Sequence, residues 1–185
     1  MDVLDEILGS LRLTGGVVVD GGFTGDFCVL AQFTPDHFAP FFAMPDRLIS
    51  YHYVRSGRLI VEVEGLPPVT LAPGSIAIVP RNAPHMLASR TGLAPAAVNE
   101  VGWITANGVH HVSMGSAGEQ TKVWCGFLGT SKASAHPLLD ALPPLLTLNL
   151  AQGEAQWLDS SMQFVAEQNP PPETVARLAE LFVSQ

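Results

Sequence analysis

Few side chains in this 185-residue sequence could catalyse a reaction or bind a ligand, and three of them lie in β-rich runs. His52 lies in YHYVRSG, His85 in PGSIAIVPRNAPHML and Cys125 in TKVWCGFL. A neutral imidazole donates and accepts hydrogen bonds and is a common metal ligand, and a thiolate is a nucleophile. The two cysteines form neither a CxxC pair nor a zinc pattern, and the sequence has no nucleophile elbow, P-loop or pair of catalytic carboxylates. We therefore expect no catalytic residues.

The orientation of Cys125 follows from the alternation of its strand. Cys125 shares one face with Val123 and Phe127, opposite Lys122 and Trp124, which predicts that the thiol faces inward. A buried cysteine is usually a small apolar side chain, and a reactive sensor thiol is the less common alternative.

The region from Val17 to about Phe127 has the pattern of a β-protein. Short β-rich runs are separated by glycine- and proline-containing turns about every ten residues. The run YHYVRSGRLIVEVEG predicts a hairpin that turns at Ser56-Gly57. IAIV, residues 76–79, is a continuous apolar run that suits a strand covered on both faces, whereas residues 88–108 lack a clear pattern and predict a long loop.

Helical patterns occur at both ends of the chain. Residues 2–12 predict a short amphipathic helix. After Thr130, HPLLDALPPLLTL predicts a short helix that ends at Pro143-Pro144. AQWLDSSMQFVAEQ and PETVARLAELFVSQ predict two further helices, and the apolar face of the first comprises Trp157, Leu158, Met162 and Val165.

Composition limits the partners of the chain. The net charge is −8, and the nine basic residues are scattered, so this sequence has no basic surface for nucleic acid. Charged residues make up 14%, against about 25% in an average domain, which predicts a large core or a surface covered by a partner. The acidic, amphipathic start is unlike a signal peptide, and no apolar run is long enough to span a membrane. We expect a soluble cytoplasmic protein.

The spacing of Gly74, Pro80 and His85 resembles the second motif of the cupin barrel. In that motif glycine opens a strand, proline closes it, and a histidine enters the barrel. Asn82 stands where the cupin pattern usually has glycine, and asparagine tolerates a positive φ better than other non-glycine residues.

Three segments extend the resemblance to a narrower family. YHYVRSG, GSAGEQTKVWCGFL and HPLLDALPPLLTL together resemble the amino-terminal cupin domain of AraC-type transcription regulators, and the closing helical segments are similar to those that precede the DNA reader. The resemblance implies a mostly β fold, a cupin-type double-stranded β-helix barrel with a short N-terminal helix and a small C-terminal helical subdomain. It places the barrel in residues 1–130 and the helical subdomain in residues 131–185. DNA contact would occur only through a helix-turn-helix domain that this sequence does not contain.

The resemblance also tests for a metal site. Metal cupins supply two histidines and a glutamate from the first motif, and the matching positions here are Ala43, Pro45 and Ser50. None of these three residues binds a transition metal well, and His85 alone holds none tightly. We therefore expect neither a metal nor another cofactor.

The same alignment makes His52 face inward, because it lies two residues after Ser50 on one strand. His52 and His85 could then face each other across the barrel. One hypothesis is that Ser50, His52, His85 and Cys125 bind a ligand in an otherwise apolar pocket. The alternative is two buried histidines bonded to backbone carbonyls.

The resemblance implies effector sensing by a bacterial regulator, with a small-molecule effector, a homodimer and no enzymatic activity. Two alternatives remain: a free-standing metal-poor cupin enzyme, and a dimerisation module whose barrel is filled and holds no ligand.

Overall fold

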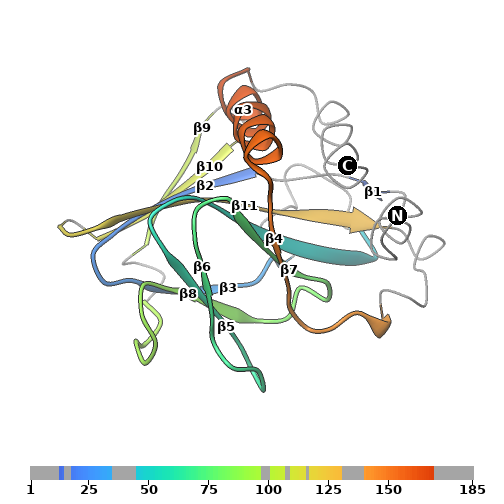
Figure 1. Cartoon of the computed structure of the whole chain (residues 1–185), viewed down its shortest axis with the longest axis horizontal. Coiled ribbons are helices and arrows are strands. Elements are labelled where there is room, and N and C mark those ends of the chain that lie inside the picture. The colour runs from blue at the N-terminus through green and yellow to red at the C-terminus, as the bar shows by residue number, and fades with distance from the viewer. Residues whose placement is uncertain are drawn as a thin grey trace.

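In the computed structural model of the chain, the described residues are 13–14, 18–34, 45–96, 101–106, 109–115, 117–130 and 140–168. They form strands arranged in two sheets, followed by one long helix (Figure 1). The larger sheet has the order β12-β7-β4-β11-β2-β10-β9, and β1 pairs with β11 off this path. Its strands are β1 (Leu13–Thr14), β2 (Val18–Thr24), β4 (Arg47–Ser56), β7 (Ser75–Val79), β9 (Gly102–Ala106), β10 (Val109–Met114), β11 (Gln120–Thr130) and β12 (Leu146–Asn149).

The smaller sheet has the order β3-β8-β5-β6 and faces the larger one (Figure 1). Its strands are β3 (Cys28–Ala31), β8 (His85–Ala88), β5 (Leu59–Val63) and β6 (Val69–Leu71). The predicted mostly β cupin barrel is confirmed. The predicted covering of residues 76–79 is confirmed as well, because Ala77 and Val79 are buried between the sheets while Ile76 and Ile78 pack on the other face.

The predicted hairpin at Ser56-Gly57 is wrong, because β4 and β5 belong to different sheets. Both edges of β4 are occupied, by β7 and β11, and β5 pairs with β6 and β8. Gly57, with φ of 78°, turns the chain from one sheet into the other at a point where a Cβ would collide with the backbone of β11.

The loop predicted over residues 88–108 is also partly wrong. Residues 102–106 form β9, which pairs antiparallel with β10 at one edge of the larger sheet. Such a short edge strand is too brief to show a clear period in the sequence. After Pro143-Pro144 the chain forms β12 and joins β7, so a segment from the second predicted domain extends the sheet of the first. The division at residues 130 and 131 stays a prediction.

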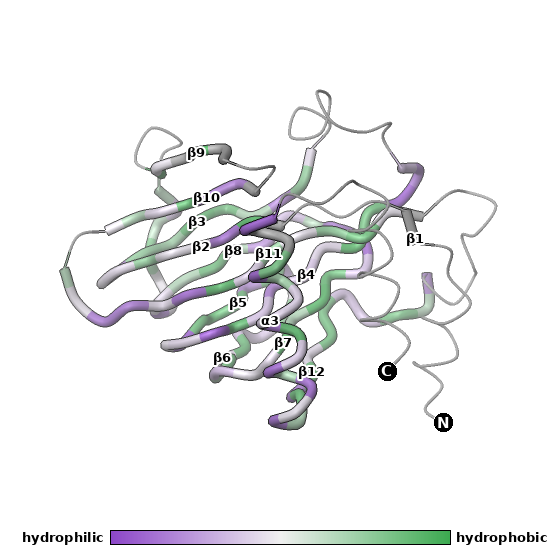
Figure 2. The backbone as a smooth tube through the Cα atoms, turned by 90° about the horizontal axis from the view of Figure 1, so that it is seen from above, coloured by the Kyte–Doolittle hydropathy of each residue, from purple (hydrophilic) through white to green (hydrophobic). Residues whose placement is uncertain are grey.

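Helix α3 (Gln152–Gln168) confirms the first of the two closing helices, and it lies on the outer face of the larger sheet (Figures 1 and 2). The Glu154 carboxylate accepts a 2.8 Å hydrogen bond from the Ala151 backbone N–H and caps the start of the helix. Leu158 and Met162 are buried against the sheet, whereas Trp157 is 39% exposed, so Trp157 does not belong to the packed face. The helices predicted over residues 2–12 and 172–185 lie outside the described residues.

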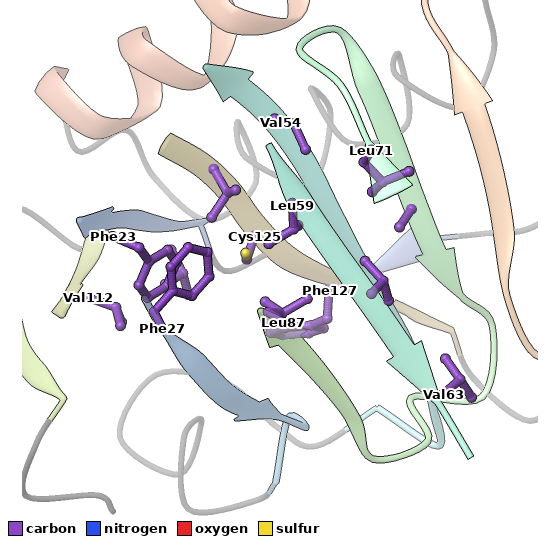
Figure 3. Packing of buried hydrophobic residues seen from close by; sticks show 14 of the residues in the cluster. Phe23, Phe27, Val54, Leu59, Val63, Leu71, Leu87, Val112, Cys125 and Phe127 are labelled. Carbon is purple, nitrogen blue, oxygen red and sulfur yellow. The ribbon is translucent and has the colours of Figure 1, made fainter. Parts of the chain in front are cut away.

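Two apolar clusters hold these layers together. The first fills the space between the sheets and includes Phe27, Val54, Leu87 and Phe127 (Figure 3). The second joins the larger sheet to α3 and comprises Tyr51, Tyr53, Trp124, Leu158 and Met162. Within the described part of the chain, no helix combines the length and apolar character that crossing a bilayer requires.

Candidate functional site

Strand β4 presents opposite chemistry to its two sides. Alternation places Ser50, His52 and Val54 toward the smaller sheet, and Tyr53 and Arg55 toward α3. His52 is opposite Cys125 of β11 on one side and Ala77 of β7 on the other. Because β4 lies inside the sheet and is covered on both faces, His52 is only 1% exposed.

His85 begins β8 after a turn that Asn82 shapes. Asn82 has φ of 48°, so the prediction that asparagine tolerates a positive φ at this turn is confirmed. Its side-chain amide also binds the Phe33 backbone twice, accepting from the N–H at 3.1 Å and donating to the carbonyl oxygen at 2.7 Å. The turn is thereby tied to the end of the β3 segment, and His85 enters the interior from a fixed backbone.

Three side chains meet in the interior, and we call Cys125, His52 and His85 the thiol–imidazole chain. His52 Nε2 and His85 Nε2 are 2.6 Å apart, and His52 Nδ1 and Cys125 Sγ are 2.9 Å apart. His85 Nδ1 lies 2.7 Å from the Ala83 carbonyl oxygen. The two rings meet edge to face, with their planes at 61°. The thiol–imidazole chain bridges the sheets, because β4 and β11 belong to the larger sheet and β8 to the smaller one.

The Ala83 carbonyl oxygen, at one end of the thiol–imidazole chain, sets the direction of every hydrogen bond in that chain. The Ala83 carbonyl can only accept, so His85 Nδ1 carries a proton and donates. In a neutral ring His85 Nε2 is then an acceptor, and His52 Nε2 must donate to it. His52 Nδ1 is therefore also an acceptor, and it receives the Cys125 thiol proton.

Burial keeps all three groups neutral. Desolvation lowers the pKa of His52 well below its ordinary value, and the neighbouring His85 lowers it further. Desolvation also lowers the pKa of His85, against the opposing effect of the Ala83 carbonyl. Desolvation raises the pKa of the Cys125 thiol, with a smaller contribution from Asp20. Cys125 is thus a hydrogen-bond donor at neutral pH rather than a thiolate nucleophile.

Ser50 lies beside this chain rather than in it. Its side chain is fully buried, and its hydroxyl lies 3.5 Å from the Val79 carbonyl oxygen, at the limit of a hydrogen bond. The structure thus brings together three of the four predicted site residues and places Ser50 two residues along the same strand. A ligand-binding role for the four remains a prediction.

Comparison with protein families agrees with the architecture. A cupin family model matches residues 2–181. The chain belongs to the cupin family. Solved structures similar to this cupin include ToxT from Vibrio cholerae O395, with 11% identity and a TM-score of 0.46, where the match covers 91% of this chain and 52% of ToxT. Wild-type ToxT from Vibrio cholerae strain SCE256 with a bound unsaturated fatty acid matches with 10% identity and a TM-score of 0.47, over 91% of this chain and 53% of that one.

This cupin spans about half the length of those ToxT chains. No curated protein matches it significantly.

The described residues of the interior do not fit a metal site. The resemblance places Pro45 and Ser50 where metal cupins have two of their ligands, and neither side chain is a good ligand for a transition metal, whereas Ala43 lies outside the described residues. The Nε2 atoms of His52 and His85 are joined by a proton, and Cys125 lies beyond the opposite nitrogen of the His52 ring, so it cannot complete a site with them. Among the described residues, no group of three or more histidine, cysteine, aspartate or glutamate side chains could hold an ion.

A second polar cluster lies on the outer face of β4, where Tyr53 and Trp124 pack against α3, and the sequence did not predict its contacts with Asp159. Asp159 of α3 accepts a 2.7 Å hydrogen bond from Arg55 Nε and a 3.0 Å hydrogen bond from Trp124 Nε1. The Arg55 guanidinium also lies over the Trp124 ring, 4.4 Å from its centroid. The Tyr53 hydroxyl donates to the Ala155 carbonyl oxygen at 3.3 Å. The available signal in the sequence was Asp159 beside the apolar stripe of its helix. Its partner Arg55 lies 104 residues away in the sequence, so the pattern of the helix could not identify it.

Proposed function

We propose that this cupin is the effector-sensing domain of an AraC-type transcription regulator and not an enzyme. The observation that carries the proposal is the position of β4 between the interior and α3. The strand holds His52 inside the barrel and holds Tyr53 and Arg55 against α3. The sequence of α3 resembles the helix that connects such a domain to its DNA reader, so β4 would link an occupied interior to that connection.

The interior chemistry favours binding over catalysis. The thiol–imidazole chain is neutral, and its two rings and its thiol are bonded to one another and to Ala83. No member is held ready as a base or a nucleophile at neutral pH. An effector acts on such a domain by binding one of two states more tightly than the other. In this cupin, an effector that separates His52 from His85 would favour a state in which β4, and α3 with it, is displaced.

Homodimerisation, a cytoplasmic location and DNA contact through a separate helix-turn-helix domain belong to the same proposal. Trp157 and Phe164 support the dimer, because these large side chains are 39% and 49% exposed on α3.

The test is a thermal-shift screen of this chain against small alcohols, phenols, carboxylates and amines, followed by hydrogen exchange on α3. A compound that raises the Tm without being consumed should change the exchange of α3. Asp159→Ala should bind the same compound but lose much of the change in α3, whereas the exposed Gln163→Ala should retain it. Chemical conversion of the compound, or binding with no change in α3, would contradict the proposal.

A second function has an observation in its favour. The described buried side-chain nitrogen and oxygen atoms all have partners within the protein. An interior in which these polar atoms are already hydrogen-bonded suits a filled barrel that holds no ligand, as in a dimerisation module. A screen in which no compound binds, combined with a stable dimer, would favour that function.

A further inference from the structure

The thiol–imidazole chain restricts what could enter between its two rings. We propose, on the basis of the proposed function, that the polar end of the effector is an uncharged hydroxyl group on an apolar body. Its oxygen would take the place of the direct bond between the two Nε2 atoms, accepting from His52 and donating to His85.

The directions of the hydrogen bonds carry this choice. When the 2.6 Å contact opens, His52 presents an N–H and His85 presents a lone pair. A hydroxyl group satisfies both with one atom. A ketone or an ether leaves the His85 lone pair without a donor, and a carboxylate directs an acceptor at an acceptor. An ammonium group has no lone pair for the His52 N–H.

The outer partners of the two rings keep this pattern when the central bond opens. His85 Nδ1 stays tied to the Ala83 carbonyl, in the turn that Asn82 fixes to Phe33. His52 Nδ1 stays tied to the Cys125 thiol. Each ring therefore retains its tautomer, and the unoccupied pair of Nε2 atoms remains one donor and one acceptor.

The surroundings require the rest of the effector to be apolar and uncharged. The neighbours of His52 in the sheet are Ala77 and Cys125, and Val63 and Ala31 are opposite His85 on its two sides. None of these residues carries a charge, and Phe127 follows Cys125 on the inner face of β11. An ionised group here would lose its hydration without gaining a counter-ion, which is costly.

Four probes with one shared body test the proposal by thermal shift and titration calorimetry. They are 4-methylphenol, toluene, 4-methylbenzoate and 4-methylbenzylamine. We expect 4-methylphenol to bind at least about tenfold more tightly than the other three, because a site that hydrogen-bonds a hydroxyl rejects analogues without one. Equal binding of toluene, 4-methylbenzoate or 4-methylbenzylamine would overturn this inference and leave the proposed function standing. If none of the four binds, the inference fails, and the wider screen decides separately whether any effector exists.

Histidine ¹⁵N NMR supplies a readout that needs no ligand. We expect His52 to carry its proton on Nε2 and His85 on Nδ1, and 4-methylphenol to shift both Nε2 signals without changing either tautomer. The opposite tautomer at either ring would overturn the proposal.

A pair of cysteine variants separates the thiol's role from simple packing. Cys125→Ala should lose most of the preference for 4-methylphenol over toluene, because the His52 tautomer is released. Cys28→Ala should keep it, because Cys28 is buried elsewhere, beside Met86. An unchanged preference in Cys125→Ala would contradict the tautomer argument.

Discussion

The two faces of β4 are stabilised in different ways. On the inner face, His52 is neutral, nearly inaccessible to water and bonded only to a thiol and a second imidazole. On the outer face, Arg55 is charged and partly exposed, and it pairs with the carboxylate of Asp159. The dry face needs a donor for every acceptor, because water cannot replace a lost partner. On the outer face water can replace part of a lost contact, so we expect changes there to cost less.

Removal of the His52 ring from the inner face should have the largest effect on stability. His52→Ala leaves a void and takes a partner from both Cys125 and His85, so we expect a loss of about 2–4 kcal/mol in the free energy of unfolding. Urea denaturation measures it. His111→Ala is the matched control, because that side chain is 42% exposed, and it should change stability by no more than about 0.5 kcal/mol. Equal losses in the two variants would remove the distinction between buried and exposed histidines.

Removal of the Asp159 carboxylate from the outer face should cost less stability. Asp159→Ala leaves the Trp124 N–H without its acceptor and leaves Arg55 with its 3.6 Å ion pair to Asp20, and we expect a loss of about 1–2 kcal/mol, since water reaches part of this cluster. Urea denaturation followed by circular dichroism measures the loss. Gln163→Ala on the exposed side of α3 should be nearly neutral. If Asp159→Ala costs as much as His52→Ala, the two faces do not differ as we describe.

Acidification should lower the stability of the fold through His52 and His85, without any substitution. The pKa values of His52 and His85 are lowered in the folded protein, so below the ordinary histidine pKa of 6.5 the unfolded chain takes up protons that the folded chain does not. Stability should be complete above that pH and should fall as the pH decreases from it. Each ring should contribute a loss of up to about 1.4 kcal/mol per pH unit, until the pH reaches its lowered pKa in the folded protein.

Urea denaturation at a series of pH values, with His52→Gln for comparison, measures this dependence. The variant should show a shallower decline. Stability that rises on acidification through this range would contradict burial of neutral rings.

The smallest effect should come from the Tyr53 hydroxyl. Tyr53→Phe removes one long hydrogen bond to the Ala155 carbonyl and keeps the aromatic packing, so we expect a loss below about 1 kcal/mol. The measurement is again urea denaturation, with tryptophan fluorescence to report on α3. A loss comparable to that of Asp159→Ala would show that the hydroxyl holds the helix as strongly as the carboxylate does.

Local patterns predicted the inner face better than the outer one. The resemblance of Gly74, Pro80 and His85 to the second cupin motif, together with the alternation along β4, implied that His52 and His85 lie in one interior, and both residues are buried there. The partner of β4 could not be predicted in this way. The pattern through Ser56-Gly57 is that of a hairpin. The two edges of β4 are instead paired with β7 and β11, which come later in the sequence than β5.

The orientation of α3 shows the same limit. Helical period alone grouped Trp157 with Leu158 and Met162, although Trp157 is 39% exposed and does not belong to the buried cluster of these two residues. The orientation is set in part by Asp159, which is held by Arg55 and Trp124. The period marks an apolar stripe, but it does not show the polar contacts with two distant strands that also hold the helix.

The position of β11 has a consequence for synthesis of the chain. This strand, Gln120–Thr130, separates β2 from β4 in the finished sheet and pairs with both. A ribosome at about 5–20 residues per second therefore makes β2 and β4 well before the strand that joins them. For those seconds β4, buried along most of its length in the folded protein, has one edge and much of its apolar surface without a partner. A nascent chain stalled before Gln120 should consequently bind chaperones or aggregate, and one that has released Thr130 can join β2 to β4 through β11.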